Sequence, residues 1–204
     1  MDFICKVRGV YGFGCAIEGM REAFNSESDS DIFQVENGLR TFSIGVKDKQ
    51  LMIKLINKGN SHAKFMRFIM VWLYICAPRY WWQEFDTYKI GVERLSQSTM
   101  HTIKKRELNR LDFIHGVDET SIEIVNMLIR KSASVGEIKK NLPEGFLQGR
   151  RVIANYQALR GMIVDRLHHK LEEWHIFIES ILNQLPHTDL LTAGMESEFN
   201  PALR

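Results

Sequence analysis

The side chains best suited to chemistry in this chain form an aromatic cluster with polar residues between its rings. The aromatic members are Tyr80, Trp81, Trp82, Phe85 and Tyr88, and the polar ones are Gln83, Glu84, Asp86, Thr87 and Lys89. Core packing accounts for most of such a cluster, because aromatic rings bury a large apolar area. The density of rings also favours a flat apolar wall with polar groups beside it. Such a wall suits a planar ring, either a nucleobase or an isoalloxazine.

A metal site is the second possibility. His168, Glu172 and His175 are spaced to share one face of an expected helix. A di-metal carboxylate site needs a second Glu-x-x-His step and two further carboxylates on facing helices. The sequence offers no such partners. A solvated face with local ion pairs is therefore the better interpretation, and we expect no metal.

Several common site motifs are missing from the sequence. Gly12-Phe13-Gly14 is too short for a phosphate-binding loop, and there is neither a nucleophile elbow nor a Cys-x-x-Cys pair. The basic runs at 104–106 and 150–151 could bind nucleic acid, but 27 basic and 25 acidic residues leave a net charge of only +2. Solvated basic faces explain these runs better, and a small anionic ligand held by a few local cations stays open.

The composition is that of an ordinary globular protein, with 45% hydrophobic and 25% charged residues among 204, which is enough for one domain with its own core. Cys5, Cys15 and Cys76 lack metal-like spacing, so we expect reduced thiols, with a catalytic thiol as the minor alternative.

The N-terminus has no long apolar segment, and the apolar run at 68–78 is shorter than the roughly 20 residues of a membrane helix. We therefore expect a cytoplasmic location.

The apolar periodicity predicts an α+β fold. Strands are expected within residues 1–15, 39–46, 69–75 and 151–155, and helices through Met20 and Phe24 and at 50–58, 79–89, 120–130, 134–142, 157–168 and 171–185. The run at 69–75 is apolar on both faces, which predicts a central strand covered on both sides. Residues 91–105 are rich in Ser and Thr and are expected to form a loop.

Two capping boxes are predicted, at Thr120 with Glu123 and at Ser134 with Glu137. The segment after Pro186 is polar, and we expect about 187–204 to be flexible at the end of a single domain covering residues 1–204.

The C-terminal third resembles the flavin-dependent thymidylate synthase family. The matching residues are Leu142-Pro143, Asn155, Leu159, Arg166 and Trp174. The interval from Pro143 to Asn155 is 12 residues and that from Asn155 to Arg166 is 11, and both are similar to the family's spacing. Lys139 stands where the family has an Arg, which keeps the charge without the planar fork.

The middle of the chain resembles the segment that leads into the family signature, through His62, Phe65 and Ala77-Pro78. The signature is an Arg-His-Arg triplet followed by spaced Ser, Asn, Ser and Arg. This chain has Thr87-Tyr88-Lys89 and then the segment 96–101, where Ser98 keeps its residue type. The resemblance covers roughly residues 60 to 190.

The resemblance implies a single α+β domain of the flavin-dependent thymidylate synthase type, with a mixed or antiparallel sheet packed with helices. It also implies a homotetramer with active sites at subunit interfaces, FAD as cofactor, and methylenetetrahydrofolate and NADPH as co-substrates. The substrate would be a pyrimidine deoxynucleotide, dUMP by default. The flavin would do the chemistry, while the protein supplies position and electrostatics.

Carried over by position, the resemblance assigns a role to each site residue. Arg166 and Ser98 would be catalytic, with Arg166 on the pyrimidine edge and Ser98 over the reacting carbon. The expected FAD contacts are Tyr88, Lys89, Asn155 and His169, and the expected substrate contacts are Glu84, Thr87, Ser98, Thr99, His101, Lys139 and Arg166. No metal is implied.

Departures from the family pattern leave the substrate open. Thr87 and Tyr88 replace two groups that hold flavin, and Met100 or His101 stands where an Arg would bind phosphate. Glu84 replaces a Gln in the pyrimidine pocket, which suggests a base with a different donor pattern, such as cytosine in dCMP. The alternative function is a nucleotide- or flavin-binding protein on the same fold that has lost catalysis.

Overall fold

The centre of the molecule is a four-stranded antiparallel sheet in the order β1-β4-β6-β5. This computed structural model describes residues 2–31, 33–36 and 40–199. The sheet strands are β1 (Ile4–Tyr11), β4 (Met70–Pro78), β5 (Val92–Ser96) and β6 (Leu147–Asn155), and a separate hairpin pairs β2 (Phe33–Glu36) with β3 (Arg40–Ser43). The α+β class and the antiparallel sheet are confirmed.

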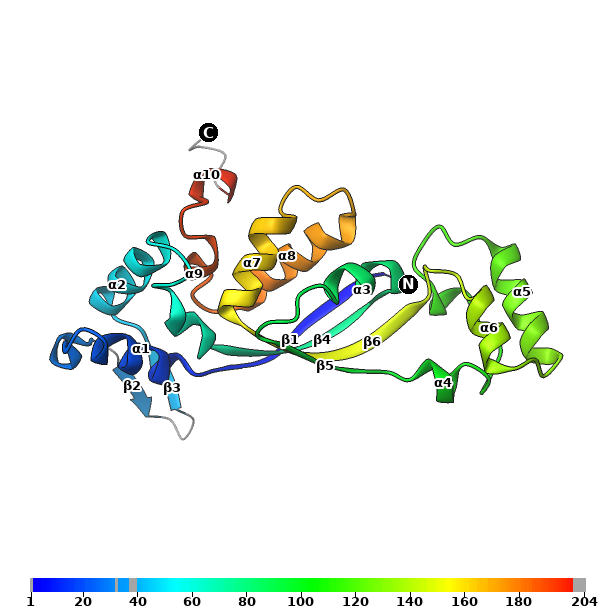
Figure 1. Ribbon diagram of the computed structural model, residues 1–204, viewed down its shortest axis with the longest axis horizontal. Helices are drawn as coiled ribbons and strands as arrows, with labels where there is room; N and C mark the ends of the chain where they lie inside the picture. Colours follow the sequence, from blue (N-terminus) through cyan, green and yellow to red (C-terminus); the bar gives the residue numbers. More distant parts are fainter. Residues whose placement is uncertain (1, 32, 37–39, 200–204) are drawn as a thin grey trace.

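Helices gather in three regions around the sheet (Figure 1). One face carries α3 (Arg79–Phe85), α7 (Tyr156–Arg166) and α8 (Glu172–Gln184). One end of the molecule carries α1 (Phe13–Glu22), α2 (Val46–Asn57), α9 (Asp189–Thr192), α10 (Glu196–Phe199) and the 3-10 turns η1 (Glu27–Asp29) and η2 (Lys64–Arg67). The opposite end carries α4 (Thr99–Thr102), α5 (Glu119–Arg130), α6 (Val135–Asn141) and the turn η3 (Arg110–Asp112).

The main core lies between the sheet and the helices on its covered face. Alternate residues of β4, Val71, Leu73 and Ile75, point into it and are fully buried. A second, smaller core packs α5 against α6 around Phe113 and Val125. The chain therefore supports two separate apolar clusters, one under the sheet and one in the distal helices.

Strand β4 lies between β1 and β6, as expected for a central strand, but the expectation of cover on both faces is wrong. Trp72 points away from the helices and is 38% exposed, and Tyr74 is half-buried. Figure 1 places α3, α7 and α8 on one side of the sheet, with none of the described helices on the other. Trp and Tyr count as apolar in the sequence pattern, yet their amphipathic rings tolerate partial exposure, which is why the pattern misled.

Residues 91–105 form more than the expected loop. Strand β5 pairs with β6 alone, as an edge strand, and α4 follows it. Glu93 and Ser96 of this strand are polar and exposed, so the sequence did not show a strand pattern there.

The cap of α5 also differs from expectation. Asp118 accepts the Thr120 amide at 2.8 Å, so the capping box predicted at Thr120 is wrong.

Other boundaries follow local signals more closely. The capping box of Ser134 with Glu137 is confirmed at the start of α6, while α2 begins at Val46 and α3 ends at Phe85, so both differ from expectation by about one turn. The strand expected at 39–46 is β3, although residue 39 lies outside the described residues.

The segment after Pro186 is packed at residues 189–193. Leu190 and Leu191 are fully buried, and Arg160 donates to the carbonyl oxygens of Leu191 and Ala193, both at 2.7 Å. The expected fraying does not extend to this part. Flexibility of the remainder stays a prediction, and residues 200–204 lie outside the described residues.

Candidate functional site

Glu84 lies at the centre of a polar cluster between α3, α7 and α8. Its Oε2 atom accepts hydrogen bonds from Arg166 Nη1 at 3.0 Å and from Trp174 Nε1 at 2.9 Å. His169 Nε2 lies 3.2 Å from the same oxygen. Oε2 therefore accepts two hydrogen bonds and has the His169 ring beside it, while Oε1 has no hydrogen-bond partner among the described residues.

The aromatic core under α3 fixes the position of Glu84. Trp81 and Phe85, its neighbours on the helix, are fully buried, and their rings stack at 5.1 Å. The Trp174 ring lies 4.8 Å from that of Trp81. Trp81, Trp82 and Phe85 are buried in the core, so the predicted apolar wall for a ligand is wrong for these three rings, although Tyr80 lines the cleft. Their role is to hold the helix that carries Glu84.

Arg166 ends α7 and links Glu84 to Tyr88. Its Nε donates to the Tyr88 hydroxyl at 3.0 Å, and its guanidinium carbon lies 5.0 Å from the centre of the Trp174 ring. Burial raises the pKa of Tyr88, although Arg166 opposes that shift, so the phenol stays protonated at neutral pH. The Tyr88 hydroxyl then donates to Asp165 at 3.3 Å. Arg166 Nη2 has no partner in the described part of the chain, so it can donate to a ligand.

His169 has a defined tautomer in this arrangement. The Leu171 amide donates to its Nδ1 atom at 3.2 Å, so Nδ1 is an acceptor and carries no proton. A neutral imidazole with an unprotonated Nδ1 carries its hydrogen on Nε2. The nitrogen that carries the hydrogen therefore lies 3.2 Å from Glu84 Oε2.

The cluster opens into a cleft of about 590 Å³, which is lined by Tyr80, Gln83, Glu84, Thr87, Arg166 and Leu171. The hydroxyls of Tyr80 and Thr87 and the amide nitrogen of Gln83 already donate to neighbouring oxygens. Burial, with help from a carboxylate neighbour, raises the pKa of Tyr80, so that phenol also stays a donor. Among the charged groups of the cleft, Glu84 Oε1 and Arg166 Nη2 keep free hydrogen-bonding capacity.

The predicted substrate residues fall into two groups that one chain does not bring together. Glu84, Thr87 and Arg166 lie at the cleft. Ser98, Thr99 and His101 lie at α4, and Lys139 lies on α6, where its Nζ is 3.7 Å from Met100 Sδ. Figure 1 places α4 and α6 beyond the end of the sheet, well away from α7 and α8.

The predicted flavin residues also divide. Tyr88 and His169 belong to the Glu84 cluster. Asn155 caps α7, accepting the Ala158 amide at 2.8 Å, while its Nδ2 has no partner among the described residues. Its backbone amide donates to Gly91 at 3.0 Å, so Asn155 lies where β5 begins, close to the exposed Lys89.

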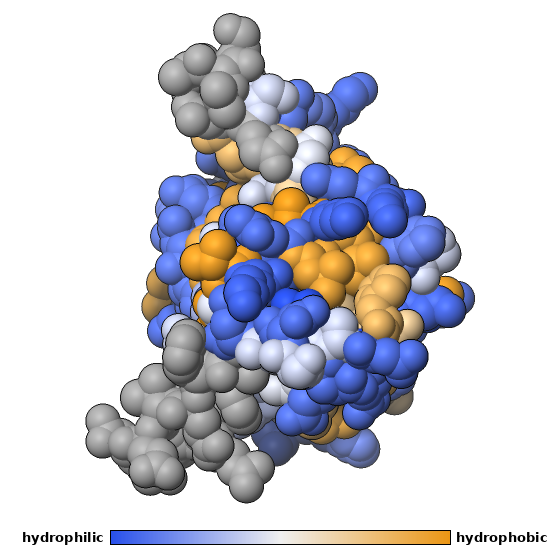
Figure 2. All heavy atoms as spheres, turned by 90° about the vertical axis from the view of Figure 1, so that its left-hand side faces the viewer, coloured by the Kyte–Doolittle hydropathy of each residue, from blue (hydrophilic) through white to orange (hydrophobic). Residues whose placement is uncertain are grey.

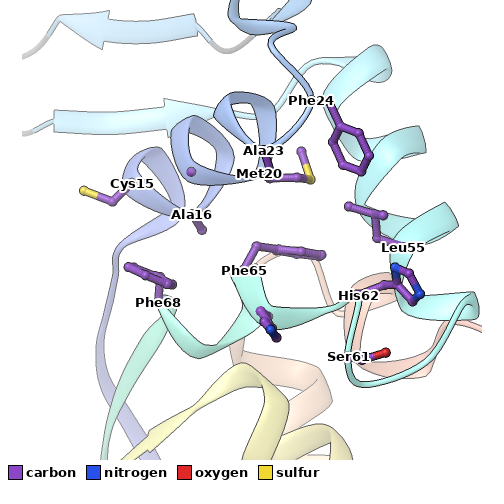
Figure 3. Close-up of a pocket in the computed structure, with 12 residues that line it drawn as sticks. Cys15, Ala16, Met20, Ala23, Phe24, Leu55, Ser61, His62, Phe65 and Phe68 are labelled. Carbon is purple, nitrogen blue, oxygen red and sulfur yellow. The ribbon is translucent and has the colours of Figure 1, made fainter.

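A second cavity lies at the end of the molecule that carries α1 and α2. Figure 2 shows apolar side chains gathered there and ringed by hydrophilic ones. The cavity measures about 330 Å³, and its lining includes Ala16, Gly19, Met20, Phe24, Leu55, Ser61, His62, Lys64, Phe65 and Phe68. Figure 3 shows Ala16 of α1 facing Phe65 and Phe68. The result is an apolar slot with polar side chains at one side.

An ionic cluster beside the cleft was missed from sequence. Asp86 bonds Arg94 Nε and Arg150 Nη1, both at 2.8 Å. The Arg150 guanidinium lies 4.1 Å from the Trp82 ring centre, and Arg151 lies over Tyr74 at 4.8 Å. Arg150 is therefore engaged in an ion pair rather than lying on a solvated basic face, whereas Arg151 is exposed as expected. Tyr80 was likewise missed as a cleft residue, although its position one helical turn before Glu84 indicates a shared face.

The described residues contain no cluster of three or more His, Cys, Asp and Glu side chains placed to hold a metal ion. His168 faces Glu198 at 3.4 Å, and both are surface residues. In the same described ranges, no helix has the length and apolar character needed to cross a membrane.

Comparison with known proteins identifies the fold. No protein-family profile matches the chain, and no curated protein is detectably similar to it in sequence. Among solved structures, the flavin-dependent thymidylate synthase ThyX of Helicobacter pylori, complexed with FAD and dUMP, is 20% identical with a TM-score of 0.74, covering 95% of this chain and 98% of its own. A second structure of ThyX from that organism is 18% identical with a TM-score of 0.72 over the full length of both chains.

A related fold occurs in the UMP/dUMP methylase PolB of Streptomyces cacaoi, bound with 5-Br dUMP. That chain is 13% identical, with a TM-score of 0.68 and 95% coverage of both chains. The likeness to these enzymes spans almost the whole chain, and at this identity it establishes the fold they share.

Proposed function

We propose that this chain is a flavin-dependent one-carbon transferase that acts on a pyrimidine deoxynucleotide, either dUMP or dCMP. The observation that carries the proposal is the cleft where Glu84 and Arg166 present one free acceptor and one free donor. The fold is shared with enzymes whose structures hold FAD and dUMP or a brominated dUMP. Methylenetetrahydrofolate would supply the carbon, and NADPH the reducing equivalents.

The residues present fit a flavin. Asn155 Nδ2 is a donor without a partner among the described residues, and Lys89 is exposed nearby. The apolar slot beside α1 accepts a flat ring, and the side chains of His62 and Lys64 at its edge suit the phosphates of FAD. Both Asn155 and Phe68 of the slot lie at the end of the sheet where β4 begins. When bound, reduced FAD would supply the hydride for the transfer.

The protein's own part in the reaction is to hold and polarise the base. Arg166 would donate through Nη2 to the pyrimidine edge and stabilise negative charge that develops on the ring. Its orientation is set beforehand by Glu84 and Tyr88, so little reorganisation is needed on binding. Thr87 lines the same cleft and would contact the nucleotide.

The proposed active form is a homotetramer whose sites are completed by neighbouring copies. Ser98, Thr99, His101 and Lys139 lie at the distal end of the chain, away from the cleft (Figure 1). A second copy could bring this end to the cleft, with Lys139 and Thr99 on the nucleotide and Ser98 over the reacting carbon. The proposed location is the cytoplasm, where the free thiols Cys5, Cys15 and Cys76 would stay reduced.

A second candidate is a nucleotide- or flavin-binding protein that has lost catalysis. It is favoured by the side chains that replace the family signature, since Thr87 and Tyr88 carry no charge. In addition, Tyr88 and His169 are already bonded within the Glu84 cluster. Such a protein would bind FAD and a nucleotide without turnover.

Product analysis tests the proposal. The full-length protein is incubated with FAD, NADPH, methylenetetrahydrofolate and either dUMP or dCMP, and the nucleotides are analysed by mass spectrometry. A methylated or hydroxymethylated nucleotide that appears only when flavin and folate are both present supports the enzyme. Flavin and nucleotide binding without any product supports the second candidate. Absence of binding to either ligand contradicts both.

A further inference from the structure

Among the described residues, the cleft presents both an unpaired acceptor and an unpaired donor to a ligand. Glu84 Oε2 accepts from Arg166 and Trp174 and has His169 Nε2 at 3.2 Å, so Oε1 is the oxygen left to accept from a ligand. Beside it, Arg166 has one terminal nitrogen without a partner in the described residues. The hydroxyls of Tyr80 and Thr87 and one N–H of the exposed Gln83 amide are engaged. The free charged groups are thus one acceptor, Glu84 Oε1, next to one donor, Arg166 Nη2.

The two pyrimidine bases differ in the edge that meets such a pair. Cytosine offers a donor, its 4-amino group, followed by two acceptors, N3 and O2. Uracil offers an acceptor, a donor and an acceptor, O4, N3–H and O2. If uracil gave N3–H to Glu84, one carbonyl could bond Arg166, and the other would lie beside the carboxylate, whose oxygens can only accept. A polar group left without a partner in this way is costly.

We propose that Glu84 and Arg166 select a 4-aminopyrimidine, so that the nucleotide bound in this cleft carries cytosine in preference to uracil. Glu84 Oε1 accepts from the 4-amino group, and Arg166 Nη2 donates to the adjacent N3 and O2. This inference rests on the proposed function, because it takes the cleft to be the pyrimidine site.

Trp174 and His169 act as positioning residues for this selection. The indole N–H and the guanidinium are donors only, so the atom at the Oε2 position must accept. In Glu84→Gln the amide oxygen takes that position, and the NH₂ group faces the cleft where Oε1 was. The substitution therefore exchanges the free acceptor for a free donor without changing the shape of the side chain. A donor there matches O4 of uracil and opposes the amino group of cytosine.

The test compares dCMP and dUMP binding to the full-length protein, by isothermal titration calorimetry with FAD present. The wild type is expected to bind dCMP at least about tenfold more tightly than dUMP, and Glu84→Gln to prefer dUMP. Glu172→Gln is the matched control, because Glu172 is exposed on α8 and lines no part of the cleft. It should keep the preference of the wild type.

The outcomes separate this inference from the proposed function. If the wild type binds dUMP as tightly as dCMP or more so, or if Glu84→Gln leaves the ratio unchanged, the base assignment is overturned while a pyrimidine site remains. If neither nucleotide binds to the wild type, the assignment and the proposed function fail together.

Discussion

At the scale of single residues, the candidate site depends on an arginine whose guanidinium is held on two sides. Arg166 is bonded by Glu84 and Tyr88 and lies against the Trp174 ring. A planar, forked cation is required for this arrangement, because two of its nitrogens bond the protein while a third remains for the ligand. A lysine at this position has a single nitrogen and cannot do both.

Replacing Arg166 by Lys is therefore expected to weaken nucleotide binding nearly as much as replacing it by Ala. Loss of a charge-assisted hydrogen bond predicts at least about a tenfold rise in Kd. Titration of nucleotide by calorimetry measures the effect. Arg110→Lys, on the distal helices, is the control and should leave Kd unchanged. Tight binding by Arg166→Lys would contradict the bidentate role assigned to the guanidinium.

The three thiols are expected to differ sharply in reactivity. Burial raises the pKa of Cys5 from 9.0 to about 12 and also raises that of Cys76, whereas Cys15 is exposed. Labelling with a disulfide reagent at pH 8 should modify one thiol per chain quickly and two only on unfolding, because the thiolate is the reactive form. Fast labelling of all three would show that Cys5 is not buried.

The raised pKa of Cys5 also sets a pH dependence of stability. Between pH 9 and about 12 the unfolded chain loses this proton while the folded chain keeps it, so the free energy of unfolding falls as the pH rises through that window. Below pH 9 both states hold the proton, and Cys5 contributes no pH dependence there. Urea denaturation across this range, compared with Cys5→Ala, measures the contribution.

At the scale of elements, α1 and α2 are joined by a buried ion pair. Arg21 Nε lies 2.7 Å from Asp48 Oδ1, and Asp48 is fully buried. The Ser30 hydroxyl and the Asp31 amide donate to its other oxygen at 2.7 and 2.9 Å. The carboxylate thus joins the two helices and the loop between them.

Asp48→Ala is expected to lower the free energy of unfolding by about 3–5 kcal/mol, because it leaves Arg21 as a buried charge without its partner. Urea denaturation measures the change. The neighbouring Lys49 forms a partly exposed pair with Asp189 at 2.9 Å, and Lys49→Ala is expected to cost about 1 kcal/mol or less. Equal effects of the two substitutions would contradict the account.

The sequence predicted the long apolar elements well because their signals are local. The strand at 69–75, the two C-terminal helices and the cap at Ser134 all follow from periodicity or side-chain chemistry near the backbone. Strand β5 and the cap at Asp118 were missed, since an edge strand carries few apolar residues and several Asp, Ser and Thr residues compete for one cap.

The candidate site was predictable in part. Glu84, Thr87 and Arg166 were expected at one pocket, and the fold brings them to one cleft. The spacing in the sequence did not reveal that Arg166, His169 and Trp174 would lie around a single oxygen of Glu84, because that contact depends on how α3 packs against α7 and α8. Nor did the sequence indicate that Ser98 and Lys139 lie far from it.

At the scale of the whole molecule, the sheet has an open face with apolar and charged residues side by side. Tyr11, Trp72 and Leu95 are exposed there, and a shallow cavity of about 320 Å³ is bordered by Arg8, Glu93 and Arg151, among others. Apolar patches of this kind mark interaction surfaces. Charges of both signs on one face allow a copy of the chain to pack against itself in an isologous contact.

Leu95→Glu is therefore expected to reduce the proposed oligomer to smaller species, because it replaces an exposed apolar side chain of this face by a charge. Size-exclusion chromatography with light scattering measures the mass of the assembly. Val46→Glu, at a similarly exposed position at the start of α2, is the control and should leave the assembly unchanged. A wild type that is monomeric at micromolar concentration would contradict the proposed tetramer.

The central claim is that the cleft of Glu84 and Arg166 binds a pyrimidine nucleotide next to a flavin. Its most direct test is the visible absorbance spectrum of the purified protein, with FAD added, before and after dUMP or dCMP. The account predicts flavin bands that shift when nucleotide is added to the wild type, and no shift with Arg166→Ala. A protein that binds no FAD at tens of micromolar, or whose flavin bands ignore both nucleotides, would contradict it.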